Sequence, residues 1–187
     1  MESRSYTEHL QFGEIRVVIT HNPAIVTLWI NIVNAYLSLP RVHPKFVFLA
    51  VLPDDQSNGS PAVLQILVHH YCLFFQLAHA PPQMPDELRH FLANSDYTFF
   101  GDFMETSLQR LYMDYQIGGN DTRRLEQRIR FMHPELTAID WTVRECAYHQ
   151  IRHRCLHGFV SYLILVIMYG VTVGICVTLL AVLAAFS

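Results

Sequence analysis

Residues Pro61 to Leu77 read PAVLQILVHHYCLFFQL, two apolar runs that only His69 and His70 separate. Runs of this length, rich in β-branched and aromatic residues, are typical of buried strands. A two-residue connection between such runs indicates a tight β-hairpin. The sequence therefore predicts paired strands at Ala62–Val68 and Tyr71–Leu77, with both histidines in a solvated turn.

The segments on either side of this hairpin alternate between strand and helix patterns. Phe12–Thr20 and Lys45–Leu52 are typical of strands, and Ala24–Leu39 repeats apolar residues at helical spacing between Pro23 and Pro40. The other expected elements are a helix at Pro85–Ala93, a strand at Tyr97–Gly101 and helices at Glu105–Tyr115, from Asp121 and from about Thr142. Such alternation predicts a layered α/β domain.

The composition excludes a disordered chain. Of 187 residues, 51% are hydrophobic and 16% are charged, whereas ordinary domains average roughly 25% charged residues. The shortage of charged residues is concentrated in the C-terminal segment, because residues 158–187 contain no Asp, Glu, Lys or Arg.

The four cysteines lack the spacing of a metal site or of a disulfide framework. We therefore expect reduced, non-nucleophilic thiols at Cys72, Cys146, Cys155 and Cys176.

Two segments carry a family resemblance. Pro61–Leu77, followed by FLANSDYTFFG at Phe91–Gly101, closely resembles the 3′–5′ exonuclease domain of the plant Werner-syndrome-like exonucleases. Weaker matches follow at Asp140-Trp141, Arg144 and Gln150-Ile151, and the resemblance covers about residues 12 to 165. That family belongs to the DnaQ-like nucleases with a DEDDy active site. The resemblance therefore implies an RNase H-like mixed sheet flanked by helices.

The resemblance also assigns the catalytic positions. Four carboxylates of the family hold two Mg²⁺ or Mn²⁺ ions that activate a water molecule, and a tyrosine orients that water. Here the first Asp-x-Glu is replaced by Ala50 and Leu52, the second Asp by Ser107, and the final Tyr-x-x-x-Asp by His153 and His157. None of these side chains is a carboxylate. We therefore predict no catalytic residue, no metal ligand and no cofactor, which makes the domain a pseudo-exonuclease.

Three alternatives retain some chemistry. A working exonuclease would need shifted acids, among which Asp54 or Asp55 requires a register slip and Asp102 and Asp140 lie outside the motifs. A zinc site would use His149, His153 and His157, which share a helix face at a spacing of four residues. A nucleophile and base pair would combine Ser107 with His153. The plain interpretation of the histidines is a polar face beside the former active site.

Nucleic-acid binding is the function that the resemblance implies in the absence of catalysis. The net charge is −3, which argues against a strongly basic binding protein. Residues 110–157 nevertheless contain eight basic and six acidic residues. We expect Arg123, Arg124, Arg152 and Arg154 to contact the phosphates of a single strand; a solvated helical face is the alternative explanation.

The C-terminal segment predicts a membrane anchor. Phe159–Phe186 is 28 uncharged, mostly apolar residues, and about 20 are enough for a transmembrane helix. Arg152 and Arg154 precede the segment, which favours a cytosolic N-terminal domain. Gly170 and Gly174 form one GxxxG, a candidate contact for a partner helix. The alternative is an apolar core or interface helix, with the nucleus or cytoplasm as the location.

The sequence thus predicts an exonuclease-like domain at residues 12–157 and a hydrophobic tail at residues 158–187. The first hypothesis is an inactive 3′–5′ exonuclease-like domain that still binds nucleic acid. The alternative is a membrane-anchored interaction or scaffold protein that reuses the fold.

Overall fold

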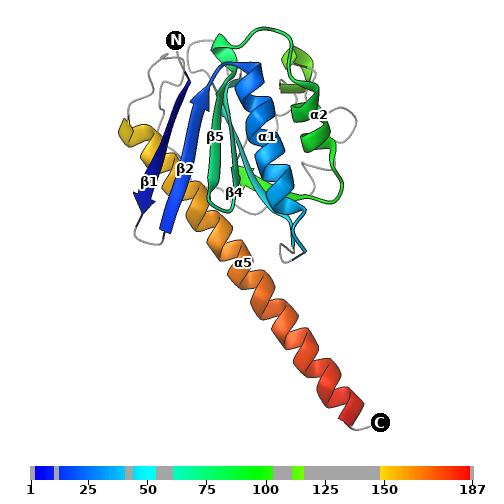
Figure 1. Ribbon diagram of the computed structural model, residues 1–187. Coiled ribbons are helices and arrows are strands. Elements are labelled where there is room, and N and C mark those ends of the chain that lie inside the picture. Colours follow the sequence, from blue (N-terminus) through cyan, green and yellow to red (C-terminus); the bar gives the residue numbers. More distant parts are fainter. Residues whose placement is uncertain are drawn as a thin grey trace.

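The computed structural model describes residues 3–10, 13–40, 44–53, 61–102, 111–115 and 148–185. Its elements, in chain order, are β1 (Arg4–Leu10), β2 (Gly13–Thr20), α1 (Pro23–Leu37), β3 (Phe46–Pro53), β4 (Pro61–Val68), β5 (Tyr71–Gln76), the short 3-10 helix η1 (Leu77–His79), α2 (Asp86–Ala93), β6 (Thr98–Asp102) and α5 (Tyr148–Ala185). The six strands form one sheet in the order β1-β2-β5-β4-β3-β6 (Figure 1).

The predicted hairpin is the centre of this sheet. β4 and β5 pair antiparallel, and Val68 lies opposite Tyr71, so His69 and His70 form a two-residue turn as expected. β3 pairs antiparallel with β4, whereas β6 runs parallel to β3 on its other side. An antiparallel meander with a parallel strand beside its first member is the RNase H-like arrangement. The predicted mixed α/β sheet is confirmed.

Two helices cover one face of the sheet. The Asn22 side chain caps α1 by accepting a hydrogen bond of 2.9 Å from the backbone N–H of Ala24. One stripe of α1, which includes Trp29 and Ile30, is buried against the odd-numbered residues of β3 and the even-numbered residues of β4. α2 buries Leu88 in the same cluster. This side of the domain is therefore an ordinary apolar core.

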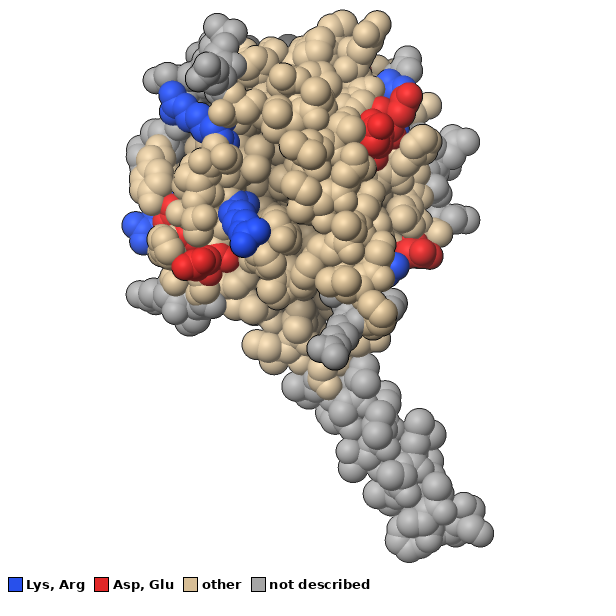
Figure 2. Space-filling view, in the orientation of Figure 1, with Lys and Arg blue, Asp and Glu red and all other residues tan. Residues whose placement is uncertain are grey.

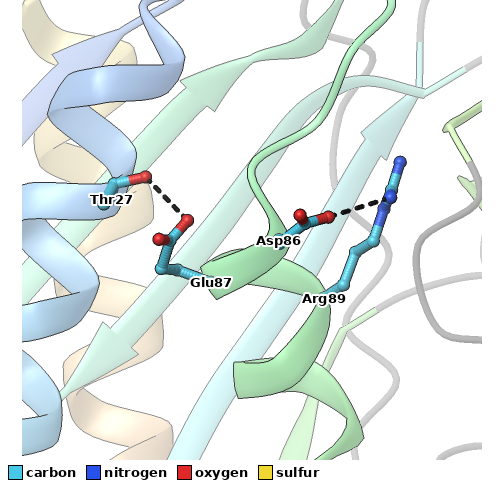
Figure 3. Close-up of polar contacts among 4 residues, drawn as sticks. All are labelled: Thr27, Asp86, Glu87 and Arg89. Carbon is cyan, nitrogen blue, oxygen red and sulfur yellow. Dashed lines mark hydrogen bonds and ion pairs between the residues drawn. The ribbon is translucent and has the colours of Figure 1, made fainter.

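Exposed polar groups join α1 and α2 at their outer edge (Figure 3). The Thr27 hydroxyl donates a hydrogen bond of 3.1 Å to a Glu87 carboxylate oxygen. Within α2, the Arg89 guanidinium lies 3.1 Å from Asp86. Surface contacts of this kind contribute little to stability, so burial of the apolar stripe accounts for the docking of α2.

α5 crosses the opposite face and continues beyond the domain (Figure 1). Ile151, Cys155, Phe159 and Tyr162 recur at helical spacing and are buried against the sheet. The helix runs without a break through residues 157 and 158. The expected boundary between domain and tail therefore falls inside a continuous helix, and packing on the sheet extends past it to Leu165.

β1 is an element that the sequence analysis missed. It pairs antiparallel with β2 over its whole length, so the sheet begins at Arg4, before the expected start at residue 12. Its sequence, RSYTEHL, has polar residues at most positions because most of this edge strand is exposed. A weak alternation of this kind predicts a strand poorly.

The predicted helix at Glu105–Tyr115 is described only at residues 111–115, which are helical. The helix predicted from Asp121 lies outside the described residues.

We expect Gly101→Ala to destabilise the domain strongly. Gly101 has a φ of +153°, and a Cβ atom there would lie 1.8 Å from the Leu49 carbonyl oxygen. The backbone strain and the clash together should lower the free energy of unfolding by at least about 3 kcal/mol. Urea unfolding of the full chain in mild detergent, followed by fluorescence, measures this.

Gly170→Ala is the matched control, because a Cβ atom at Gly170 has no neighbour within 4 Å. It should change the free energy of unfolding by no more than about 1 kcal/mol. Equal effects of the two substitutions would contradict the parallel pairing of β6 with β3 at this point.

Candidate functional site

The first two motif positions lie on β3, on the face that α5 covers. Ala50 and Leu52 are 0% and 1% exposed and belong to the same buried cluster as Ile151 and Cys155 of α5. A methyl group and an isobutyl group offer no lone pair to a metal ion. Where the family would carry two ligands, this chain has apolar core.

The third motif lies on α5. The His157 ring centroid is 6.2 Å from that of Phe48, which precedes Ala50 by two residues on the same face of β3. The structure therefore brings His157 close to β3, while the His153 side chain is exposed. Ser107 lies outside the described residues, and so does the side chain of His149.

No metal-holding cluster is present among the residues that the structure describes: no three His, Cys, Asp or Glu side chains come close enough together. The zinc site at His149, His153 and His157 remains a hypothesis for that reason, since one of its three side chains is not described. Asp54, Asp55 and Asp140 also lie outside the described residues.

Asp102 is the described acid nearest in strand register to the first motif. It ends β6, and in the parallel register of β3 and β6 it pairs with Ala50. Parallel strands bring their C-terminal ends to the same edge of a sheet, which is where ligands bind in open α/β sheets. Sequence reasoning counted Asp102 along the chain instead and therefore missed this proximity. The sequence signal for this position was an acid, Asp102, directly after the apolar strand residues and Gly101, which places it at a strand end.

Gln65 fixes α5 over the sheet at this level. Gln65 pairs with Ala50 in the register of β4 and β3, and its side chain is fully buried. The side-chain N–H₂ donates to the Arg154 carbonyl oxygen at 3.2 Å and to the Cys72 sulfur at 3.7 Å. A lone amide within the apolar run PAVLQILV was its sequence signal. Buried amides need such partners, so Gln65 specifies where the helix lies.

The predicted phosphate-binding arginines differ in their surroundings. Arg152 is 56% exposed, and its Nε lies 3.0 Å from a carboxylate oxygen of Glu8. Arg154 is only 5% exposed and so is not presented to a ligand in solution. Arg123 and Arg124 lie outside the described residues. Of the four, Arg152 alone has a described and accessible side chain.

Glu8 is a buried carboxylate that the sequence did not single out. Its side chain is 3% exposed although it lies on the edge strand β1. The Tyr148 hydroxyl donates a hydrogen bond of 2.6 Å to it, and this bond raises the pKa of Tyr148. Burial raises the pKa of the neighbouring Tyr6, whose ring lies 6.0 Å from that of Tyr148. Both phenols stay protonated at neutral pH, so neither is a general base and the cluster holds the start of α5 on β1.

Cys72 and Cys155 form no disulfide among the described residues. Both are buried, and their sulfur atoms lie 3.9 Å apart. Cys146 and the side chain of Cys176 are outside the described residues.

Charged side chains are sparse on the face shown in Figure 2. There the basic and acidic residues form small, separate groups, and most of the described surface is uncharged. Proteins that follow a nucleic-acid backbone usually present a continuous basic groove. The described part of this face carries no such track.

Comparisons with known proteins give weak likenesses. No protein-family profile and no curated protein matches the chain, whereas 11 chains among solved structures do. The EXD2 exonuclease domain soaked in Mg and GMP is 15% identical with a TM-score of 0.46, over 78% of this chain and 84% of that chain. The same domain soaked in Mn and dGMP is 16% identical with a TM-score of 0.43, over 82% of this chain and 90% of that chain. This similarity does not show what the present chain binds, nor does it single out the plant Werner-syndrome-like family.

We expect Glu8→Ala to destabilise the domain by about 1–3 kcal/mol, because the Tyr148 hydroxyl and Arg152 lose a shared and buried acceptor. Thermal unfolding monitored by circular dichroism measures this. The matched control is Glu14→Ala, which removes an ion pair of 3.1 Å to His9 between side chains that are 67% and 74% exposed. That pair should contribute less than about 1 kcal/mol. If Glu8→Ala costs no more than the control, Glu8 does not hold α5.

Proposed function

We propose that the chain is a catalytically inactive 3′–5′ exonuclease-like protein that binds single-stranded nucleic acid. The observation that carries the loss of catalysis is the burial of Ala50 and Leu52 as core residues at the first motif. Two-metal hydrolysis needs anionic ligands at fixed positions, and an alkyl side chain there removes both the ligand and the space for a metal ion. The narrower resemblance to the plant Werner-syndrome-like exonucleases is part of the same proposal.

Binding of nucleic acid would rest on cationic side chains and not on metal ions. The half-exposed Arg152 near the start of α5 and the expected contacts at Arg123 and Arg124 support it. Phosphate contacts of this kind release counterions, so affinity must fall as salt rises. With only three such arginines, we expect weak and strongly salt-sensitive binding.

The test combines a nuclease assay and a binding assay on the full chain in mild detergent. With Mg²⁺ or Mn²⁺, a 3′-overhang DNA and its RNA counterpart should stay intact beside an active exonuclease as positive control. A labelled single strand should shift on a native gel at low salt. Arg123→Ala with Arg124→Ala should weaken the shift about tenfold or more, since each contact contributes about 1 kcal/mol or more at low salt.

Arg89→Ala is the control for binding, because Arg89 lies on α2 across the sheet from α5 and pairs with Asp86. It should leave the shift unchanged. Shortening from the 3′ end that EDTA abolishes would overturn the loss of catalysis. Asp102→Asn would then be the first variant to test, since Asp102 pairs with Ala50 in the sheet. No shift at low salt would overturn nucleic-acid binding.

A second candidate function is a membrane-anchored interaction protein. It is favoured by the apolar surface that α5 exposes once it leaves the sheet, with Ile167 62% and Met168 61% exposed. Residues Ile151–Gly170 form a stretch of 20 helical residues that is long and apolar enough to span a membrane, and about a third of it is buried in the domain. The buried part packs on the sheet, so a span would begin after it. The N-terminal domain would face the cytosol, and Gly170, which has open space around it, would face a partner helix.

We expect the full chain to stay in the membrane pellet after a carbonate wash. Ile167→Lys with Met168→Lys should release it, because each lysine in a membrane span costs up to about 3 kcal/mol. Leu28→Lys with Ile32→Lys is the matched control, since both residues are exposed apolar positions on α1. Release of the unaltered chain by carbonate would favour the interface-helix alternative instead.

A further inference from the structure

Aromatic side chains surround the point where α5 leaves the domain. The Tyr162 ring lies 6.1 Å from the ring of His69 in the β4–β5 turn. On the other face of the sheet, His69 lies 5.5 Å from the ring of Tyr36 near the end of α1. Two turns further along α5, Tyr169 lies 5.6 Å from Phe46 at the start of β3. Rings from four elements thus meet at one end of the sheet.

The start of β5 lies at the same end of the sheet. The Tyr71 ring lies 5.9 Å from Tyr36, and the Arg16 guanidinium lies 5.6 Å from its centroid. We call Tyr36, His69 and Tyr71, the rings at this end that are partly or fully exposed on the domain itself, the aromatic collar. Tyrosine is enriched where a protein crosses the boundary between hydrocarbon and water, because its ring is apolar and its hydroxyl is polar.

The imidazoles at this end carry little charge at neutral pH. Burial lowers the pKa of His69, and burial, His69 and Arg16 together lower the pKa of His70. Nearby charges are of both signs, since Lys45 lies over the Tyr97 ring and Glu14 pairs with His9. Such a surface suits a neutral headgroup layer better than a strongly anionic one.

Tyr162, whose ring lies beside His69 of the collar, is followed without a loop by the exposed apolar part of α5. From Leu163 to Tyr169 every residue is apolar or aromatic; Leu163 and Leu165 still pack on the sheet, whereas Ile164 and Val166 to Tyr169 are exposed. Seven residues of helix rise about 10 Å, which exceeds the roughly 5–7 Å thickness of one interfacial layer of a bilayer. If these residues enter hydrocarbon, the collar must lie in the interface.

We propose that this end of the domain docks on the interfacial layer of a zwitterionic bilayer, with the aromatic collar among the lipid headgroups. This inference rests on the proposed membrane anchorage. Leu39 supports it, since its side chain is 51% exposed and its backbone N–H bonds the Tyr36 carbonyl at 3.1 Å. β3 runs away from the collar, so Ala50 and the Asp102 backbone beside it lie about 13 Å along the sheet from Phe46 at this end.

The experiment uses the full chain in phosphatidylcholine vesicles with lipids brominated near the headgroup, which quench tryptophan at short range. Leu39→Trp places a reporter beside the collar. Leu28→Trp is its matched control, because Leu28 is 57% exposed on α1 but eleven residues nearer the opposite end of the sheet. The native Trp29 and Trp141 are present in both variants, so the quenching measured for the unaltered chain is subtracted. We expect quenching of the reporter at position 39 to be at least twice that at position 28.

His70→Trp provides a second reporter in the β4–β5 turn and should also be quenched. Met168→Trp reports on α5 itself and should respond to lipids brominated deeper in the chains. Quenching at 168 without quenching at 39 and 70 would overturn the docking while leaving the anchorage intact. Equal quenching at 28 and 39 would also overturn it, because the domain would then lie on its side. No quenching at 168 would overturn the anchorage itself.

Discussion

The close approach of α5 to the sheet is the contact on which the rest of this structure depends. A Cβ atom at Gly158 would lie 3.1 Å from the Phe48 ring and 3.3 Å from the Gln65 amide, so any larger residue would make these side chains shift by a few tenths of an ångström. Gln65 then bonds the Arg154 carbonyl and fixes the helix along its length. Together these contacts set which residues of α5 are buried and where the helix leaves the domain.

The position of α5 over the sheet explains why Ala50 and Leu52, which the resemblance assigns to the first motif, are buried core residues. Ala50 and Leu52 contribute apolar surface beneath α5, and a buried leucine side chain stabilises a fold by about 2 kcal/mol. A carboxylate in the same place would be costly to bury unless a metal ion or a cation compensated it. Apolar residues at these two positions suit the core beneath α5, which is the reason that the proposed function is binding and not hydrolysis.

α5 also joins two environments in one rigid element. Its first turns are amphipathic because one face meets the sheet, whereas Val166 to Tyr169 are exposed and the helix continues beyond the domain (Figure 1). A continuous helix transmits orientation, so whatever surrounds the later turns fixes how the domain is held. The proposed docking of the aromatic collar follows from this continuity, and it would leave the C-terminal ends of β3 and β6 open to partners from the aqueous side.

The sequence by itself determined the central hairpin, the alternation of strands and helices, the missing carboxylates and the apolar character of the tail, because these are properties of residue type and local periodicity. Tertiary structure alone decided that the polar segment Arg4–Leu10 completes the sheet, that Gln65 holds α5, that Arg154 is buried, and that Asp102 lies beside Ala50. Each of these depends on a partner far away in the chain. Local patterns encode how much of a residue is buried, but not which distant group lies against it.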